Sequence, residues 1–277
     1  MIEPALSDDA FLADVEAAPR SADLLHLWWL GQSGFLLQQQ NTRILMDPYL
    51  SDSLTIKYAQ TDKPHVRMSR RVIDPERLTQ INFITASHAH TDHLDAHTLL
   101  PLQHANPDFH FATSRANLRT AEQRLGRDVD RPIETGESVT VDGVEVHAIP
   151  SAHETIERDE SGSCLYLGFI LNFGNHCIYH SGDTILYDGL VETLRPFKID
   201  LAILPINGRA PERRVAGNLW GREAAWLAKE IGAKLVVPCH YDMFEFNTAT
   251  PDEFVAECER LGQPYKVLRM GERLTIS

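Results

Sequence analysis

The stretch INFITASHAHTDHLD, residues 81–95, decides the fold of this protein. Residues 81–86 form a short apolar run of the length and composition typical of a buried strand. The polar string HAHTDH follows directly, so its side chains are expected in a loop at the carboxyl end of a strand, where functional residues gather. Imidazole and carboxylate are ligands of zinc, manganese and iron. The string therefore predicts a metal centre, and four ligands so close together indicate two ions rather than one. The candidate ligands are His88, His90, Asp92 and His93.

Three further candidate ligands follow other predicted strands. They are His153 in HAIPSAHE, Asp183 in IYHSGDT and His240 in LVVPCHYD. Each residue alone is more often structural, and the alternative for HAHTDH is a histidine-rich surface loop. The recurrence of ligand-type residues at strand ends disfavours that alternative. His153 is preferred over His147, because the alternation of VEVHAI places His147 within a strand, on its more polar side.

The order of the predicted elements indicates an α/β fold. Strand-rich meanders open each half of the chain, at residues 24–46 and 138–180, and alternating strands and helices follow them. Such a pattern suits two sheets packed face to face with helices outside. Residues 23–277 are expected to form one domain with a final strand at 265–270, and residues 1–22 a tail that contains a short amphipathic helix.

Composition restricts the partners of the protein. The 277 residues include 26 Lys and Arg against 39 Asp and Glu, a net charge of −13, which repels nucleic-acid phosphate over most of the surface. Four cysteines without a CxxC pair favour a reducing compartment. No apolar run reaches the ~18 residues of a membrane span, and the acidic N-terminus differs from a signal peptide. We therefore expect a cytoplasmic protein that binds neither nucleic acid nor membranes, while a homo-oligomer stays open.

The motifs HAHTDH, AHE, SGDT and PCHYD together resemble those of the metallo-β-lactamase-fold hydrolases, from about Trp28 to the end of the chain. Finer strings, WLGQSGF, DPYLSDS, YHSGDT, LPINGR and PCHYD, are similar to the branch that contains L-ascorbate-6-phosphate lactonase. The resemblance implies an αββα sandwich of two mixed sheets, with metals at one edge between them. It also implies that one metal is held by His88, His90 and His153 and the other by Asp92, His93 and His240, with Asp183 as the bridge.

The same resemblance implies a metal-dependent hydrolase of a small anionic ester. The nearest substrate is a lactone of a phosphorylated sugar acid, attacked by a metal-bound hydroxide. Asp92 and Asp183 would orient this nucleophile or accept its proton. The nitrogen and oxygen ligands suit two divalent ions of zinc or manganese, and iron is also compatible. Two alternatives remain: a phosphodiesterase of the N-acylphosphatidylethanolamine phospholipase D type, and a metal-binding scaffold without turnover.

Weaker candidates surround this ligand set. Asp47, in MDPYL, either hydrogen-bonds a ligand imidazole or only forms an Asp-Pro turn. Two basic clusters in irregular segments are either solvated or bind an anionic substrate. They comprise Lys57, Lys63, Arg67, Arg70 and Arg71 within residues 55–73, and Arg209, Arg213 and Arg214. The predicted substrate contacts are Asn207, Arg209 and Tyr241, which follow strand ends.

Overall fold

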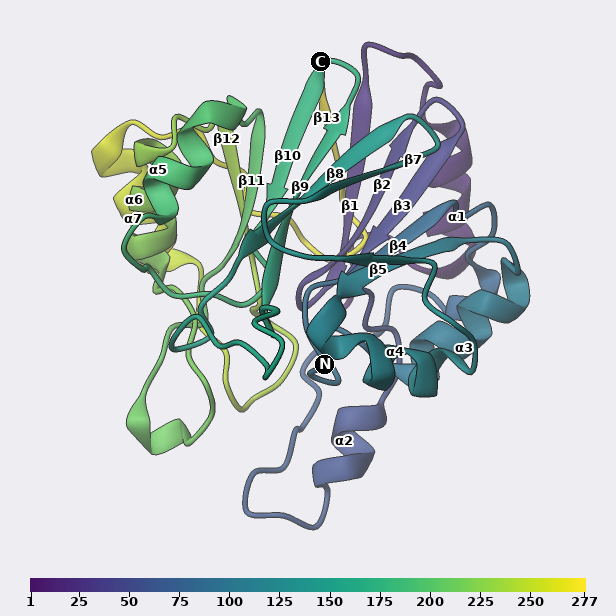
Figure 1. Ribbon diagram of the computed structural model, residues 1–277, viewed down its shortest axis with the longest axis horizontal. Coiled ribbons are helices and arrows are strands. Elements are labelled where there is room, and N and C mark those ends of the chain that lie inside the picture. The colour runs from purple at the N-terminus through teal and green to yellow at the C-terminus, as the bar shows by residue number, and fades with distance from the viewer.

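Two β-sheets packed face to face form the centre of the computed structural model, which describes residues 1–277 (Figure 1). The seven-stranded sheet has the order β13-β1-β2-β3-β4-β5-β6, and the six-stranded sheet has the order β12-β11-β10-β9-β8-β7. The strands of the first sheet are β1 (Leu25–Gly31), β2 (Gly34–Gln39), β3 (Thr42–Met46), β4 (Phe83–Ala86), β5 (His110–Ser114), β6 (Arg131–Ile133) and β13 (Arg273–Ile276). Those of the second are β7 (Ser138–Val141), β8 (Val144–Pro150), β9 (Leu167–Phe173), β10 (His176–His180), β11 (Leu201–Pro205) and β12 (Leu235–Cys239).

Each sheet is built from an antiparallel meander that continues into parallel strands. In the first sheet β1, β2 and β3 are antiparallel, and β3 to β6 are parallel. In the second, β7 to β10 are antiparallel, and β10 to β12 are parallel. The central parallel strands, such as β4 and β11, are buried along their whole length and are mostly apolar because both of their faces are covered. The predicted fold class, an α/β sandwich of two mixed sheets with outer helices, is confirmed.

Helices lie on the outer faces of the sandwich. α1, α3 and α4 lie beside the first sheet and α5, α6 and α7 beside the second, while α2 projects beyond the sheets (Figure 1). The α-helices are α1 (Asp8–Ala17), α2 (Ser53–Tyr58), α3 (Ala96–Ala105), α4 (Leu118–Leu125), α5 (Leu190–Leu194), α6 (Gly221–Glu230) and α7 (Asp252–Leu261). Short 3₁₀ turns are η1 (Pro75–Arg77), η2 (Arg115–Asn117), η3 (Arg195–Phe197) and η4 (Pro211–Arg213). None of these helices has the length and apolar character needed to cross a membrane.

The N-terminal segment packs against the first sheet through α1. Phe11 and Val15 of this helix are buried in the same core cluster as the strands. The rings of Phe11 and Trp28 meet edge-on, with centroids 6.5 Å apart, and Trp28 Nε1 donates to Asp14 Oδ2 at 2.8 Å. The amphipathic helix expected in this segment is therefore present and packed, whereas the domain boundary after residue 22 stays a prediction.

The C-terminal strand differs from the prediction. Residues 265–270 were expected to form it, but the strand that closes the first sheet is β13, paired with β1. The preceding segment divides its hydrogen bonds between two neighbours. The Lys266 amide donates to the Val236 carbonyl at 3.0 Å, on the second sheet, and the Gly271 amide donates to the Trp29 carbonyl at 2.7 Å, on the first sheet. The segment thus crosses from one sheet to the other, and this crossing prevents a continuous ladder.

The carboxyl ends of four strands deliver the candidate ligands to one edge of the sandwich. The loop after β4 carries HAHTDH, and the loops after β8, β10 and β12 carry His153, Asp183 and His240. Glycine is required in the third of these loops. Gly182 has φ +59°, and a Cβ there would lie 2.6 Å from the Leu167 carbonyl oxygen and 2.7 Å from Ser87 Cβ. The β10 loop therefore passes close to the β4 loop, and this approach brings the two halves of the ligand set together.

Candidate metal centre

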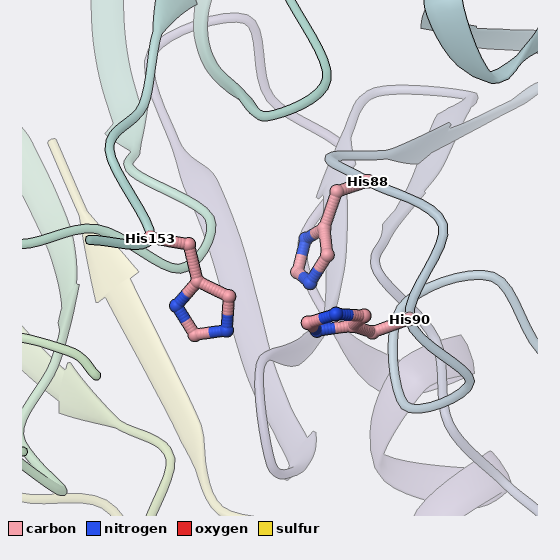
Figure 2. A group of neighbouring side chains, drawn as sticks. All are labelled: His88, His90 and His153. Atoms are coloured by element: carbon pink, nitrogen blue, oxygen red, sulfur yellow. The ribbon is translucent and has the colours of Figure 1, made fainter. Parts of the chain in front are cut away.

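The seven predicted ligands lie together as three overlapping groups. Within each group, one nitrogen or oxygen atom per residue lies within 4.8 Å of the others. The groups are His88, His90 and His153; His88, His93 and Asp183; and Asp92, His93 and His240. Figure 2 shows the rings of the first group facing one another across the gap between two loops. The strand-end positions recognised in the sequence therefore converge in space.

A single buried carboxylate, Asp47, orients two of the imidazoles. His93 Nδ1 donates to Asp47 Oδ2 at 2.6 Å. Ser87 Oγ donates to the same carboxylate oxygen and accepts from His88 Nδ1 at 3.0 Å. Both rings therefore direct Nε2 away from Asp47, and neither Nε2 atom has a hydrogen-bond partner although both are buried. This is the contact expected of a carboxylate that fixes the tautomer of a metal-binding histidine.

Backbone and amide groups orient the ligands of the second sheet. His153 Nδ1 donates to the Gly217 carbonyl at 2.8 Å, so its Nε2 faces Asp183 Oδ2 at 3.5 Å. The side-chain amide nitrogen of Gln32 donates to Asp92 Oδ2 at 2.8 Å and lies 3.0 Å from His240 Nε2. The Gln32 carbonyl also accepts from the His240 amide at 3.0 Å. Gln32, in the turn between β1 and β2, thus fixes one ligand from each sheet.

Opposing charges shift the pKa values across this cluster. Burial lowers the pKa of His88 well below its ordinary value. Burial is the largest single influence on His93 and His240 and opposes their charged forms, but the Asp183 and Asp92 carboxylates together outweigh it. The pKa of His93 therefore rises well above its ordinary value, and that of His240 rises to about 9. Burial would raise the pKa of Asp183, yet the charges of His93 and His240 hold it well below its ordinary value. Protonated His93 and His240 thus balance the negative charges of Asp92 and Asp183.

The donor set fits divalent metal ions. Besides the two unpartnered histidine nitrogens, Asp183 Oδ1 is buried without a hydrogen-bond partner. It lies 3.4 Å from His93 Nε2, while Asp183 Oδ2 lies 3.5 Å from the Nε2 atoms of both His153 and His240. Buried polar atoms are normally paired, so this convergence of lone pairs is the feature expected of a metal site. Asp183 contacts histidines of both implied triads, and the bridging role that the family resemblance implies for it stays a prediction.

A cavity of about 400 Å³ opens over the cluster. Five candidate ligands line it: His90, Asp92, His153, Asp183 and His240. Four cationic side chains also line it, namely Lys57, Lys63, Arg124 and Arg214. Lys63 Nζ donates to the Arg214 carbonyl, which ties the α2 segment to the η4 segment across the opening. Of the two basic clusters in the sequence, these are the members that reach the cavity, and Arg124 from α4 joins them.

The predicted substrate contacts lie behind the cavity wall. Tyr241 is buried, its ring lies tilted against that of Trp29 with centroids 4.3 Å apart, and its hydroxyl donates to the Leu268 carbonyl. Asn207 is buried and donates to Asn247, which itself lines the cavity. Neither predicted residue is brought to the opening, because each side chain satisfies its polar groups within the protein.

The basic residues that miss the cavity are held by other partners. Arg209 forms paired hydrogen bonds to Glu223 at 2.6 and 2.7 Å and lines a separate depression. The buried Arg67 guanidinium donates to the Ser51 and Ser69 carbonyls, and Arg70 pairs with Asp8. Arg71 forms an ion pair with Asp74. Arg214, from the same loop as Arg209, does line the cavity, but its guanidinium pairs with Asp62 at 2.6 Å.

Sequence reasoning missed Gln32, Arg124, Tyr58 and His65, which all line the cavity. Gln32 lies in WLGQSGF, one of the strings of the family resemblance, so a signal for it was present. The other three carry no such spacing. His147, the rejected alternative to His153, is on β8 and contacts Glu145 and Phe197.

Comparison with known proteins agrees with this geometry. Residues 42–241 match the Beta-lactamase superfamily domain. A UPF0173 metal-dependent hydrolase from Rubrobacter xylanophilus is 30% identical over 260 residues, which cover 89% of this chain and 94% of that relative. Igni18, a metallo hydrolase from Ignicoccus hospitalis, has a TM-score of 0.68 at 21% identity, covering 92% of this chain and 99% of that one. An isothiocyanate hydrolase from Delia radicum gut bacteria has a TM-score of 0.71 at 18% identity, covering 91% and 99%.

The structural likenesses show a shared fold, and the sequence matches show the family. The domain match spans most of the chain, and the bacterial relative aligns along nearly its whole length. The alternative of a scaffold without turnover is therefore set aside in favour of metal-dependent hydrolysis. The chain belongs to the UPF0173 metal-dependent hydrolases of the β-lactamase superfamily.

Proposed function

We propose that the protein hydrolyses a small anionic ester, with a lactone as the leading substrate type. The observation that carries this proposal is the composition of the cavity wall, which combines the ligand cluster with four cations in a protein whose net charge is −13. The cavity volume of about 400 Å³ suits a small molecule rather than a polymer. Arg214 is paired with Asp62, whereas Lys57, Lys63 and Arg124 form no ion pair with a carboxylate and can attract an acidic substrate.

The ligand assignment of the proposal follows the groups that lie together. His88, His90 and His153 would hold one divalent ion, and Asp92, His93 and His240 the other, with Asp183 between them. Zinc and manganese suit these nitrogen and oxygen donors, as does iron. Such ions, when bound, polarise an ester carbonyl and lower the pKa of water towards neutrality.

The two aspartates are assigned the proton transfers. The side-chain amide of Gln32 donates to Asp92 Oδ2 at 2.8 Å, and the contacts of Asp92 with His93 and His240 also involve Oδ2 rather than Oδ1. We assign Asp92 Oδ1 to orient the attacking water and accept its proton. Asp183, more deeply buried, keeps the histidines in place through its contacts of 3.4 to 3.5 Å. A low pKa keeps both carboxylates ionised and able to accept at neutral pH.

The cations are assigned to the acidic group of the substrate. Lys57 forms no ion pair with a carboxylate, and its Nζ lies 5.1 Å from the centre of the Tyr58 ring. Arg124 is fixed by its hydrogen bonds to the Ala89 and Leu94 carbonyls, both at 2.7 Å. A fixed guanidinium and a free ammonium together bind a phosphate or carboxylate without a large loss of side-chain entropy.

A matched substrate panel tests the proposal. Lactones that carry a phosphate or carboxylate are compared with the same lactones lacking it, in the presence of Zn²⁺ or Mn²⁺, with bis-p-nitrophenyl phosphate as the phosphodiester. We expect kcat/KM to be about ten- to hundredfold higher for the acidic lactones, corresponding to one charged hydrogen bond. Asp183→Asn should abolish turnover. Faster cleavage of the phosphodiester than of any lactone would instead support the phospholipase-type alternative, and equal rates for charged and uncharged lactones would contradict the anionic substrate.

A further inference from the structure

An aromatic wall forms one side of the metal cavity. It consists of Tyr58, His65, Phe244 and Phe246, all of which line the cavity. The rings of Tyr58 and His65 are stacked, with centroids 4.4 Å apart and planes 27° apart. Phe244 and Phe246 each meet the His65 ring edge-on at 5.3 Å. Phe244 is buried, while the other three rings are partly exposed. Four aromatic rings that contact one another therefore line this side of the cavity.

Backbone hydrogen bonds hold the aromatic wall in place. Residues 66–68 and 243–245 run antiparallel, with a bridge between Arg67 and Phe244. The Met68 amide donates to the Met243 carbonyl at 2.8 Å, and the Glu245 amide donates to the Val66 carbonyl at 2.9 Å. The candidate ligand His240 lies a few residues before the paired segment 243–245. The position of the wall is thus linked directly to the position of the metal ligands.

His65 contributes a neutral ring to the wall. His65 Nδ1 donates to the Lys63 carbonyl at 2.9 Å, and Thr55 Oγ1 donates to the His65 backbone carbonyl at 2.7 Å. Burial is the main cause of a lowered pKa at His65. The groups around it are the Tyr58 hydroxyl, the ammonium groups of Lys57 and Lys63, and the Asp92 carboxylate. An uncharged imidazole between aromatic rings offers a flat surface that favours stacking.

We propose that the aromatic wall is the subsite for a planar ring in the substrate, beside the reacting group. This inference rests on the proposed function for the identity of the reaction, but the wall makes a separate prediction about binding. Offset stacking and edge-to-face contacts are available to a flat ring and unavailable to a puckered ring of similar size. An aliphatic lactone would leave the wall largely unused. The substrate class is therefore narrowed to an acidic ester that carries an aromatic or other planar unsaturated group.

Binding of two matched phosphonates tests the subsite without requiring turnover. Phenylphosphonate and cyclohexylphosphonate share the anionic group and differ in ring planarity. Their dissociation constants are measured by calorimetry on the zinc-loaded protein, with inorganic phosphate as a ligand that has no ring. We expect phenylphosphonate to bind about three- to tenfold more tightly than cyclohexylphosphonate, as expected for one favourable aromatic pair.

Two variants and one control assign this preference to the wall. In Phe246→Leu and Tyr58→Leu, the ratio of the cyclohexylphosphonate dissociation constant to that of phenylphosphonate should fall towards one. The affinity for inorganic phosphate should be unchanged. Trp226→Leu removes a 40% exposed aromatic ring on α6, outside the cavity, and should keep the wild-type ratio. A ratio of one in the wild type, or an unchanged ratio in both wall variants, overturns the subsite. Ester hydrolysis with a ratio of one refutes the subsite alone, whereas the expected ratio without hydrolysis of any ester refutes the proposed function alone.

Discussion

Asp47 shows how one residue determines the direction of several others. Its carboxylate is fully buried, accepts from His93 Nδ1 and Ser87 Oγ, and also accepts from the Ser87 amide at 2.9 Å. The chain reaches this position through an unusual backbone conformation, with φ +43°. Aspartate tolerates the left-handed region better than most residues do. The alternative role of Asp47 as a simple turn former therefore describes its backbone, while its side chain has the contact that the ligand-orienting interpretation predicts.

Replacing Asp47 should weaken metal binding more than it perturbs the fold. In Asp47→Asn one of the two acceptor oxygens becomes an NH₂ donor. This donor then faces either the Ser87 backbone amide, which bonds Oδ1, or His93 Nδ1 and Ser87 Oγ, which bond Oδ2. We expect a 10- to 100-fold loss of metal affinity, as is typical when such a partner is removed. Competition with a chromophoric chelator measures it. Asp95→Asn is the matched control, because Asp95 is equally buried but bonds Ser51 and Thr98; an equal loss of affinity in both variants would contradict the assignment.

The raised pKa of His240 gives the metal site a pH dependence that extends above neutrality. A histidine with a pKa of about 9 keeps its proton throughout the neutral range, and this proton must leave when Nε2 binds a metal. The charged form stabilises the metal-free fold below the ordinary histidine pKa of ~6.5, and this stabilisation is lost as the pH rises through about 9. Metal affinity should therefore increase at least about tenfold per pH unit between pH 7 and 9, because the pKa of His93 in the same triad is also raised and its proton must leave as well. Chelator competition at several pH values measures it, and a plateau already at pH 7 would contradict the shift.

At the scale of elements, the site depends on how closely the loops after β4 and β10 can approach. Gly182 and Gly262 have nearly the same φ, +59° and +60°, but a Cβ at Gly262 would meet open space. Gly262→Ala should cost only the ~1–2 kcal/mol of a left-handed alanine. Gly182→Ala adds a steric overlap with the Leu167 carbonyl and Ser87, so we expect the free energy of unfolding to fall by ~3 kcal/mol or more. Urea unfolding of the metal-free variants measures both values, and equal losses would show that the loops can separate freely.

The elements also show what the sequence could predict. The strand before HAHTDH and the strand-end positions of His153, Asp183 and His240 follow from local periodicity and motif spacing, and the three groups of neighbouring ligand atoms agree with them. The aromatic wall follows from no such pattern, because Tyr58 and His65 meet residues 244–246 only in the folded protein. The basic clusters are visible in the sequence, but the sequence does not show which of their members line the cavity. The same limit explains Arg209, whose partner Glu223 lies on α6. Local sequence gives the direction of a strand, while the partner of a loop side chain depends on the whole fold.

At the scale of the whole molecule, the ligand set connects the two sheets. HAHTDH extends from β4 of the first sheet, and His153, Asp183 and His240 extend from strands of the second. Each of the two proposed ligand triads takes residues from both: His153 joins His88 and His90, and His240 joins Asp92 and His93. Metal binding should therefore oppose separation of the sheets, which is the step that exposes the core between them. Unfolding the protein would release every ion held in this way.

The concentration dependence of stability then counts the ions. A ligand that binds only the folded state raises the free energy of unfolding by RT ln(1 + [L]/Kd). Each bound ion thus adds about 1.4 kcal/mol per tenfold increase in free metal above its Kd. If two ions bind, the free energy of unfolding should rise by about 2.8 kcal/mol for each tenfold increase in free metal concentration. Urea unfolding in metal buffers measures this slope. His153→Ala should reduce the slope to about half by removing one triad, whereas His147→Ala, on β8 beside Phe197, should leave it unchanged. A wild-type slope of 1.4 would establish a single ion, and a reduced slope in His147→Ala alone would reverse the choice between the two histidines.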